Sequence, residues 1–335
     1  MAEVEGLSVR RAAVLGHPIA HSLSPVLHSA AYRALGLDAW QYGLLDVQES
    51  ELPGVIASLD HTWAGLSLTM PLKQAVLPLL DHVEPLAEVV GAVNTVLVQG
   101  RPARLGEPAP TARPALVGAN TDVYGIVAAV QEAVGAVGRS LPAHPRAVVL
   151  GAGATAASAL AALGQLGCTT PTVHLRSVGR SGALLRAAHR MGVEPTYLAL
   201  DEAVASMVRA DVVISTLPAH AADGLAATLA ALLGGPDAEV VAIPGGEDPG
   251  STSDWTATSP RVLLDVVYDP RPTALSTAWA HAGGVVAHGE RMLLHQAAEQ
   301  VRLMTGRPAP LAAMDTALAA ALDRGEGAPE QESGR

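Results

Sequence analysis

Short apolar runs alternate along the chain with longer amphipathic or alanine-rich stretches. Runs of four to seven apolar residues between polar turns predict strands, and the stretches between them predict helices. In the first third of the chain, the predicted strands are 12–15, 40–45, 65–69, 92–98 and 115–118. The predicted helices begin at Ser24–Pro25, with Gly36 as the stop, and continue with 49–59, Pro71 to Leu80 and 123–134. The segment 99–114 is rich in Pro, Gly and Arg and predicts an exposed loop.

The same alternation starts again after residue 146. Predicted strands lie at 147–150, 172–175, 211–215, 240–243 and 262–267, and helices follow 151–156, cover 181–190 and cover 291–305. Strands that alternate with helices predict an α/β fold with a parallel sheet covered by helices. The tail from about Asp323 is polar and glycine-rich, which predicts disorder.

Length and apolar content indicate two domains. The chain has 335 residues, 49% of them apolar, which is enough for each half to bury its own core. The pattern places the first domain at 1–125, with a C-terminal helix of about 290–320 packing back on it. The second domain is expected at 126–289, and the disordered tail at 322–335.

Charge and composition exclude several classes of partner. The net charge is −11, which disfavours nucleic acid and anionic membranes but permits a local basic pocket for a small anion. The single cysteine, Cys168, allows no intrachain disulfide and no thiolate metal cluster. No stretch approaches the ~18 apolar residues of a membrane span, so a soluble cytoplasmic protein is expected.

Lysine is almost absent. Lys73 is the one lysine among 21 lysine and arginine residues. An ammonium group can give up a proton, whereas a guanidinium cannot, so Lys73 is a candidate for proton chemistry. The alternative is that it persists by chance on the surface.

A glycine-containing turn follows the apolar run 147–150. Its order is strand, Gly151-Ala152-Gly153-Ala154-Thr155-Ala156, then an alanine-rich helix. This GxGxxA context predicts a dinucleotide site, because the turn brings backbone N–H groups and the helix N-terminus to a pyrophosphate. The alternative is a tight turn that binds nothing.

The end of the next predicted strand indicates the choice of cofactor. An NAD site usually places Asp or Glu there, but this chain has Arg176-Ser177 and then Arg180. Arginine beside a hydroxyl suits a 2′-phosphate, so NADP is predicted rather than NAD. Arg176 as an ordinary surface residue is the alternative.

Polar clusters in the first third lie on loops beside the predicted strand ends. Each has a structural explanation of its own, since Ser24 or Asp122 would cap a helix and Asn94-Thr95 would fit a turn. Together they resemble a known family through the segments LGHPIAHSLSPVLH, SLTMPLK, GAVNT, GANTD, LGAGATA, LLDVVYDPRPTAL and GERMLLHQA. In this order, from Val14 to about Gly306, the segments resemble the shikimate dehydrogenase family.

The resemblance implies an N-terminal α/β substrate-binding domain and a C-terminal Rossmann domain for NADP. It implies the reversible reduction of 3-dehydroshikimate to shikimate. Two alternatives stay open: a quinate/shikimate or aminoshikimate dehydrogenase of the same fold, and a catalytically idle NADP-binding paralogue. The expected partner is a small anionic substrate, and the expected assembly is a monomer or a homodimer.

The resemblance also assigns roles to residues. Lys73 and Asp122 are implied at the reacting carbonyl. The implied substrate residues are Ser22, Ser24, Thr69, Asn94, Tyr268 and Gln296. The implied cofactor residues are Gly151, Ala152, Gly153, Ala154, Thr155, Arg176, Ser177, Arg180, Val266 and Gly289.

Four positions depart from the family pattern. Ser67 replaces a common Asn, and Ala154 replaces the second glycine of a Gly-Gly pair. Leu175-Arg176-Ser177 stands for Asn-Arg-Thr, and Ser215-Thr216-Leu217-Pro218 stands for Asn-Ala-Thr-Pro. None of these changes affects Lys73 or Asp122.

These residues suggest a mechanism. Lys73 follows Pro71 at a predicted helix start, where the helix dipole would lower its pKa, whereas a nearby Asp122 would raise it. The hypothesis is that Lys73 polarises the carbonyl oxygen while Asp122 orients it. The histidines show no HxxxH-type spacing combined with acidic residues of the kind that binds metals, so no metal is expected.

Overall fold

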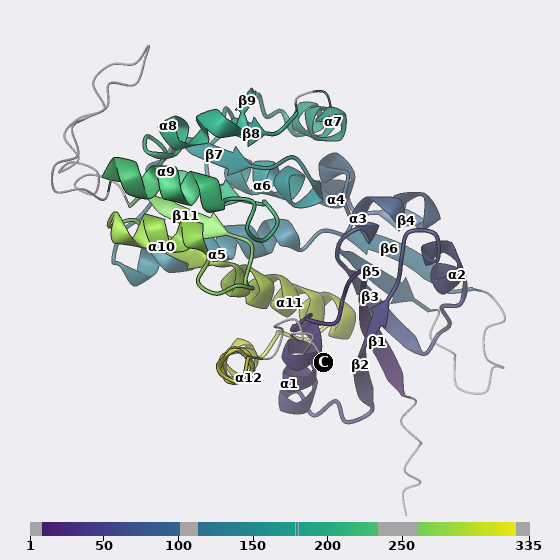
Figure 1. Ribbon diagram of the computed structural model, residues 1–335. Helices are drawn as coiled ribbons and strands as arrows, with labels where there is room; N and C mark the ends of the chain where they lie inside the picture. Colours follow the sequence, from purple (N-terminus) through teal and green to yellow (C-terminus); the bar gives the residue numbers. More distant parts are fainter. Residues whose placement is uncertain (1–8, 101–112, 178, 180, 234–259, 326–335) are drawn as a thin grey trace, which may run out of the picture. The chain divides into compact units, whose positions relative to one another are not determined.

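The computed structural model of the chain describes residues 9–100, 113–177, 179, 181–233 and 260–325 (Figure 1). It divides into two compact units. Unit 1 comprises Met1–Thr121 and Gln296–Arg335, and unit 2 comprises Asp122–His295. The first division therefore falls at the start of a helix that contacts strands of unit 2, instead of at residue 125.

Unit 1 is built around a mixed six-stranded sheet. Its elements are β1 (Arg10–Gly16), α1 (Ser24–Ala34), β2 (Trp40–Asp46), α2 (Leu52–Ala57), β3 (Trp63–Leu68), α3 (Leu72–Ala75), the 3₁₀ turn Leu77–Leu79, β4 (His82–Val83), α4 (Pro85–Val90), β5 (Thr95–Gln99), β6 (Ala115–Ala119) and α12 (Leu311–Asp323). The strand order is β2-β1-β3-β5-β6-β4. Strand β1 is parallel to β2 and β3, whereas β5 is antiparallel to β3 and β6.

Register places the ends of β1 and β3 side by side. Val14 pairs with Ser67, and Leu15 pairs with Leu68. The apolar residues of these strands form one core with α2 and α3, in which Leu15 and Leu66 are completely buried. The segments that follow the two strands, where polar candidates cluster, are consequently carried by a rigid base.

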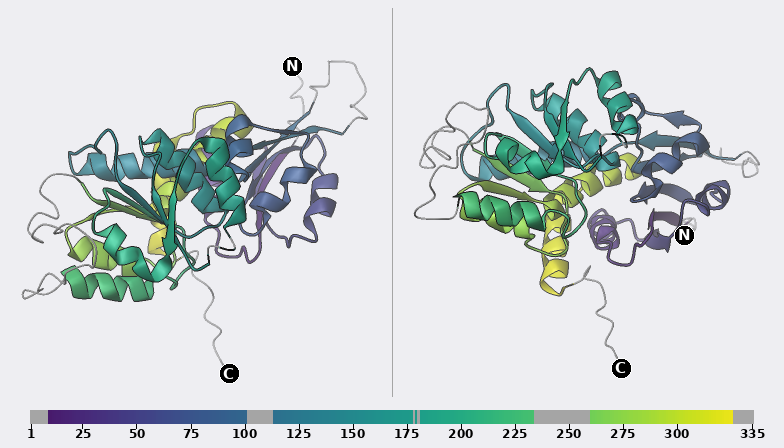
Figure 2. Two further views of the ribbon diagram at one scale, coloured as in Figure 1. Left: turned by 90° about the horizontal axis from the view of Figure 1, so that it is seen from above. Right: turned by 45° about the horizontal axis from the view of Figure 1, so that its top comes forward.

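Unit 2 is a parallel sheet with helices between its strands (Figure 2). Its elements are α5 (Asp122–Ala136), β7 (Ala147–Leu150), α6 (Ala154–Gln165), β8 (Thr172–Leu175), α7 (Gly182–Met191), β9 (Thr196–Ala199), α8 (Ala203–Met207), β10 (Val212–Ser215), α9 (Asp223–Leu233), β11 (Val262–Asp265), α10 (Ala274–His281), β12 (Val285–His288) and the start of α11 (Gly289–Thr305). The strand order is β12-β11-β10-β7-β8-β9.

This strand order is that of the dinucleotide-binding Rossmann fold. Numbered within the unit, the strands run 3-2-1-4-5-6, with the change of direction between β7 and β10. Ligands of such sheets bind at the carboxyl ends of the strands on either side of this change. The predicted α/β class with a parallel second sheet is confirmed.

Three predicted helices were wrong in extent. The helix expected from Pro71 to Leu80 ends at Ala75, because Pro78 lacks an N–H and obstructs the preceding turn. The helix expected at 49–59 is α2, which begins at Leu52 with a proline in its first turn. The single helix expected at about 290–320 is two helices, α11 and α12.

The break between α11 and α12 has a local cause. Gly306 has φ +70°, a left-handed conformation that ends helices, and Pro308 and Pro310 follow it. Helix α12 includes residues 322 and 323, which the sequence assigned to the tail. The predicted strand 240–243, most of the loop 99–114 and the tail 326–335 lie outside the described residues.

Several short elements were missed. They are β4, α4, β9, α8, α9, α10 and β12. The strands among them have two to four residues, and the helices α9 and α10 are rich in alanine and lack a clear polar face. Periodicity is weak in such segments, so their positions depend on packing within the sheet.

Candidate active site

Thr69 and its neighbours form the turn that follows β3. The Thr69 N–H donates to the Leu15 carbonyl at 2.9 Å, and the Thr69 carbonyl accepts from Leu72 N–H at 2.9 Å. A Cβ at Gly16 would lie 2.3 Å from Thr69 Cγ2. Glycine at position 16 therefore lets Thr69 pack directly against the end of β1.

Lys73 lies on α3, directly after this turn. Its side chain is half-buried, and its carbonyl accepts from Val93 N–H at 2.8 Å, which ties Lys73 to the residue before Asn94. Helix α3 has only four residues, and Lys73 is the second of them.

Asn94 is the centre of a buried cluster of amides and hydroxyls. Its Oδ1 accepts from the Thr121 backbone N–H at 2.8 Å and from Thr95 Oγ1 at 2.9 Å. Its Nδ2 donates to Thr121 Oγ1 at 2.9 Å and to Gln296 Oε1 at 3.2 Å. Because a backbone N–H can only donate, it fixes which Asn94 side-chain atom is oxygen.

The structure thus brings together two predicted substrate residues, Asn94 and Gln296, with Thr121 between them. Sequence reasoning missed Thr121, although it stands inside the quoted GANTD segment. Gln296 is 8% exposed, and its Nε2 has no hydrogen-bond partner among the described residues. The Gln296 Nε2 group is therefore available to donate a hydrogen bond to a ligand oxygen.

Ser22 and Ser24 lie at the start of α1. Ser22 Oγ accepts from Ser24 N–H at 3.3 Å, and Ser24 is buried and hydrogen-bonded to Tyr42. Ser24 was expected as a possible helix cap, but it is the first helical residue, and Leu23 occupies the cap position without a side-chain bond. Ser22 is the more exposed of the two hydroxyls.

Behind these residues lies a second group of buried polar side chains, of which the sequence singled out only Ser67, as a departure from the family pattern. Tyr42 OH donates to Ser67 Oγ at 2.7 Å, and Ser67 Oγ donates to Gln300 Oε1 at 2.9 Å. His28 stacks on Tyr42 with ring centroids 3.9 Å apart. Burial raises the pKa of Tyr42 and lowers that of His28 to about 3, so both rings are neutral.

The one sequence signal for this group is a spacing. Gln296 and Gln300 are four residues apart on α11, so both face the same side of the helix. Two amides on an otherwise apolar helical face indicate a polar contact in the interior. The partners could not be identified from spacing, because they come from positions 175 or more residues away.

In unit 2, the turn after β7 has the geometry that a dinucleotide requires. Gly151 has φ +111°, and a Cβ there would lie 2.5 Å from Thr216 Oγ1. Thr216 donates from both its N–H and its hydroxyl to the Leu150 carbonyl, each at 2.8 Å. Glycine at position 151 therefore lets the β7 turn pack against the segment that follows β10.

Gly153 has a different function from Gly151. It occupies the cap position of α6, it is exposed, and no atom lies within 4 Å of where its Cβ would be. Ala152, Ala154 and Thr155 are partly exposed around it. The first N–H groups of α6 have no partner within the helix, so this open space can admit a pyrophosphate.

The other predicted cofactor residues lie at the same edge of the sheet. Arg176 and Ser177 follow β8 directly and are exposed, whereas Arg180 lies outside the described residues. Gly289 begins α11, and a Cβ there would lie 2.6 Å from the Val266 carbonyl oxygen, so these two residues are in contact. Tyr268 follows on the same loop, and burial raises its pKa, with Asp269 adding to the effect.

Asp122 is the first residue of α5 and belongs to unit 2, whereas Lys73 belongs to unit 1. Asp122 is 3% exposed. The preceding residues Asn120 and Thr121 are anchored in unit 1, since Asn120 Nδ2 donates to the Ala92 carbonyl at 2.9 Å. The pairing of Lys73 with Asp122 stays a prediction.

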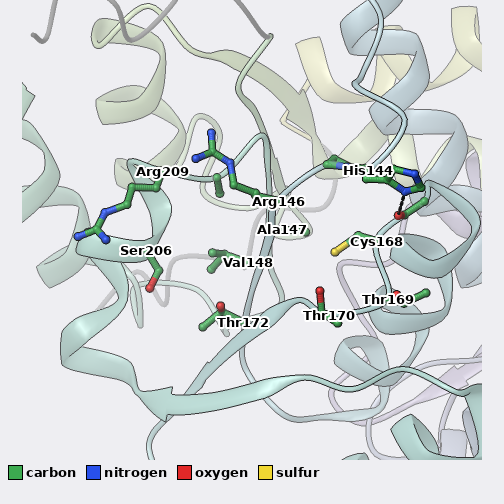
Figure 3. Close-up of a pocket in the computed structure, with 13 residues that line it drawn as sticks. His144, Arg146, Ala147, Val148, Cys168, Thr169, Thr170, Thr172, Ser206 and Arg209 are labelled. Atoms are coloured by element: carbon green, nitrogen blue, oxygen red, sulfur yellow. Dashed lines mark hydrogen bonds between the residues drawn. The ribbon is translucent and has the colours of Figure 1, made fainter. Parts of the chain in front are cut away.

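A hollow of about 530 Å³ lies elsewhere in unit 2 (Figure 3). It is lined by the first residues of β7 and β8 and by Cys168, Ser206 and Arg209. These positions are at the amino ends of the parallel strands, opposite the edge that carries Gly151 and Arg176. The hollow is therefore separate from the predicted dinucleotide site.

Metal-ligand clusters and membrane-spanning helices are both absent from the described residues. They contain no group of three or more His, Cys, Asp or Glu side chains that could hold a metal ion. No helix in the described ranges combines the length and apolar character needed to cross a membrane.

Family models match at both ends of the chain. Residues 14–96 match the shikimate dehydrogenase substrate binding domain, and residues 289–319 match the shikimate 5′-dehydrogenase C-terminal domain. The NADP⁺-dependent shikimate dehydrogenase of Citrifermentans bemidjiense is 36% identical over 322 residues, covering 93% of this chain and 95% of that protein. The enzyme of the same name from Moorella thermoacetica is 33% identical over 321 residues, covering 95% of each.

Solved structures give the same result. The shikimate dehydrogenase of Mycobacterium tuberculosis has a TM-score of 0.70 and 40% identity, covering 93% of this chain and 99% of that one. The Thermus thermophilus enzyme, solved with NADP(H) and shikimate, has a TM-score of 0.66 and 30% identity, with coverage of 93% and 99%. On this similarity across nearly the whole chain, the protein belongs to the shikimate dehydrogenase family.

Proposed function

We propose that this chain catalyses the reversible NADPH-dependent reduction of 3-dehydroshikimate to shikimate. Relatives with this activity in their names match more than nine-tenths of the chain. The observation that carries the proposal is the cluster of Asn94, Thr121 and Gln296, which ends in the Gln296 N–H donor. A ring with several hydroxyls offers the oxygen atoms that such a donor requires.

Unit 1 supplies all the substrate contacts in this proposal except Tyr268, which belongs to unit 2. Ser22 and Ser24 bind the substrate carboxylate, with Ser22 as the accessible hydroxyl. Thr69, Asn94 and Gln296 bind ring hydroxyls, and Tyr268 contributes on the carboxylate side. A neutral ester of shikimate is expected to bind much more weakly than shikimate itself.

Unit 2 supplies the cofactor contacts. When bound, NADPH would supply the hydride, and the residues present fit it, because Gly153 leaves open space in front of the first N–H groups of α6. The segment Gly151 to Thr155 would hold the pyrophosphate, while Arg176 and Ser177, with Arg180, would hold the 2′-phosphate. Val266 and Gly289 would lie beside the nicotinamide.

Lys73 and Asp122 act at the carbonyl that becomes the alcohol. The Lys73 ammonium donates a hydrogen bond to the carbonyl oxygen, which stabilises the negative charge that develops there. The hydride would add to the carbonyl carbon, and a proton transferred from the Lys73–Asp122 pair to the oxygen completes the hydroxyl. Asp122 keeps the ammonium oriented.

An assay of NADP⁺ reduction with shikimate tests the proposal. Purified protein is expected to form NADPH with shikimate and to use NADP⁺ with a higher kcat/KM than NAD⁺. Quinate and aminoshikimate are the comparison substrates, and a higher kcat/KM for either would replace shikimate as the substrate. No turnover with any of the three would indicate an idle paralogue.

The proposal also includes where and in what form the enzyme works. A cytoplasmic location is expected, with a monomer or homodimer as the working form. Cell fractionation tests the first, and light scattering of the purified chain tests the second.

A further inference from the structure

Gln300 has a completely satisfied amide in the interior of unit 1. It is 1% exposed. Its Oε1 accepts from Ser67 Oγ at 2.9 Å and lies 3.2 Å from His28 Nε2. Its Nε2 donates to Thr95 Oγ1 at 3.0 Å and to the Asn94 carbonyl at 3.4 Å. An amide side chain offers two donors and two accepting positions, and Gln300 uses all four.

The surroundings fix the orientation of this amide. The Asn94 carbonyl can only accept, so the Gln300 atom that faces it is nitrogen. The other atom is then oxygen, and it receives the Ser67 hydroxyl hydrogen. Since this oxygen can only accept, the His28 Nε2 that faces it at 3.2 Å carries a hydrogen and supplies the second hydrogen bond.

The hydrogen bonds consequently run in one direction through the interior. Tyr42 donates to Ser67, and Ser67 donates to Gln300. Gln300 in turn donates to Thr95, and Thr95 donates to Asn94 Oδ1. Asn94 donates to Gln296 Oε1, which leaves Gln296 Nε2 as the terminal donor. Chains of hydrogen bonds in a dry interior strengthen one another.

We propose that Gln300, acting through the Thr95 hydroxyl, is a positioning residue that holds Asn94 and Gln296 in the orientation that binds a substrate hydroxyl. All four hydrogen-bonding positions of Gln300 are used within the protein, so its amide has none left for a substrate. The inference rests on the proposed function for the identity of the substrate. Its geometric basis lies wholly within unit 1.

Thr95 offers the sharpest test, because it is completely buried and joins Gln300 to Asn94. Thr95→Val keeps the branched shape and removes both hydrogen bonds. KM for shikimate is expected to rise about tenfold, the factor that corresponds to one hydrogen bond, while KM for NADP⁺ stays within about twofold. Thr95→Ser restores the hydroxyl and is expected to restore the wild-type KM.

Gln300→Met tests Gln300 itself, whereas Thr95→Val tests only its hydrogen-bonded connection to Asn94. It removes four hydrogen bonds with little change in volume, so KM for shikimate is expected to rise at least as much as in Thr95→Val. The matched control is Val301→Ala on the same helix, which is also completely buried but makes no side-chain hydrogen bond. It is expected to lower Tm and to leave KM for shikimate unchanged.

Three results would overturn the inference. One is a wild-type KM for shikimate in both Thr95→Val and Gln300→Met. Another is a Thr95→Ser enzyme as impaired as Thr95→Val. The third is a Val301→Ala enzyme that shows the same rise in KM, which would assign the effect to loosened packing.

The proposed function can fail without deciding the positioning role. If wild-type enzyme turns over quinate or aminoshikimate instead, the same variants are compared with that substrate. If Gln300→Met does not fold, the Thr95→Val and Thr95→Ser pair decides. An enzyme with no turnover would be examined by calorimetry with shikimate, and equal affinity of wild type and Thr95→Val would contradict the inference.

Discussion

The two units present binding groups in different ways. In unit 2, the turn after β7 offers backbone N–H groups, and the strand behind it, β7 itself, is entirely apolar and buried. In unit 1, the corresponding strand ends offer side chains, and a buried polar network around Gln300 lies directly behind them. Backbone recognition requires only space and free N–H groups, whereas side-chain recognition requires further residues to hold each side chain in place.

This difference predicts which substitutions change substrate binding and which change cofactor binding. A change at a unit 1 side chain should affect substrate binding or chemistry and leave cofactor binding intact. A change at the β7 turn should do the opposite. The following experiments test that separation, starting with the largest expected effect.

Lys73 carries the strongest prediction for unit 1. Lys73→Ala is expected to lower kcat by about 10²–10⁴-fold, the range for loss of acid–base assistance, with KM for NADP⁺ unchanged. Lys73→Arg keeps the charge but is also expected to be impaired, because its guanidinium has a different geometry and does not release a proton. Steady-state kinetics measure both, and the exposed neighbour Gln74→Ala is the control. Unchanged kcat in both Lys73 variants would remove Lys73 from the mechanism.

Two glycines of the β7 turn form a matched pair. Gly151→Ala places a methyl 2.5 Å from Thr216 Oγ1 at φ +111°, so the free energy of unfolding is expected to fall by about 1–3 kcal/mol. Gly153→Ala adds its methyl to open space, so Tm is expected to stay unchanged while KM for NADP⁺ rises. Thermal melts and kinetics check both. A normal KM for NADP⁺ in Gly153→Ala would mean that the pyrophosphate does not approach this position.

Arg176 is the exception within unit 2, because here a side chain is expected to recognise the cofactor. Arg176→Gln is expected to lower kcat/KM for NADP⁺ by about 10–100-fold, since a charged hydrogen bond to phosphate contributes about 1.5–3 kcal/mol. The value for NAD⁺ should change little. An equal loss of kcat/KM with NADP⁺ and NAD⁺ would show that Arg176 does not bind the 2′-phosphate.

The burial of His28 in unit 1 makes the stability of the protein depend on pH. Its pKa is about 3 in the folded protein against an ordinary 6.5, so the unfolded chain takes up a proton in this interval and the folded chain does not. Stability from this group is complete above pH 6.5 and is lost as the pH falls toward 3. Between about pH 6.5 and 5 the loss is about 1–2 kcal/mol.

His28→Phe keeps a ring on Tyr42 but cannot titrate. Denaturant unfolding at several pH values is expected to show a shallower acid dependence for this variant than for wild type. The same slope in both would show that His28 does not control acid stability. His174 of unit 2 is also expected to contribute to the acid dependence of stability, because burial lowers its pKa as well.

The sequence predicted the two units unequally, for a physical reason. The dinucleotide turn is local, so Gly151, Gly153 and the following helix are readable from one stretch of residues. The network of unit 1 joins residues such as Ser67 and Gln300, which are 233 positions apart and only meet once the sheet has formed. His28 and Thr95 stand inside the segments LGHPIAHSLSPVLH and GAVNT, but sequence reasoning assigned a role to neither, and Tyr42 lies in none of the quoted segments.

The missed boundaries have the same kind of explanation. Pro78 and Gly306 each end a helix that apolar periodicity alone would continue. At both positions the conformational limit of the residue overrides the apolar pattern. Very short elements such as β4 have too few residues for any periodicity, so only the paired neighbour strand reveals them.

The half-buried position of Lys73 has a spectroscopic consequence. Since the printed sequence contains no other lysine, reductive methylation with ¹³C-formaldehyde would label one side chain besides the chain's own amino terminus. The resulting NMR signal would follow the ionisation of that amine directly and would shift when an anion occupied the neighbouring turn. The scarcity of lysine thereby gives this enzyme a built-in reporter at the position where its chemistry is expected.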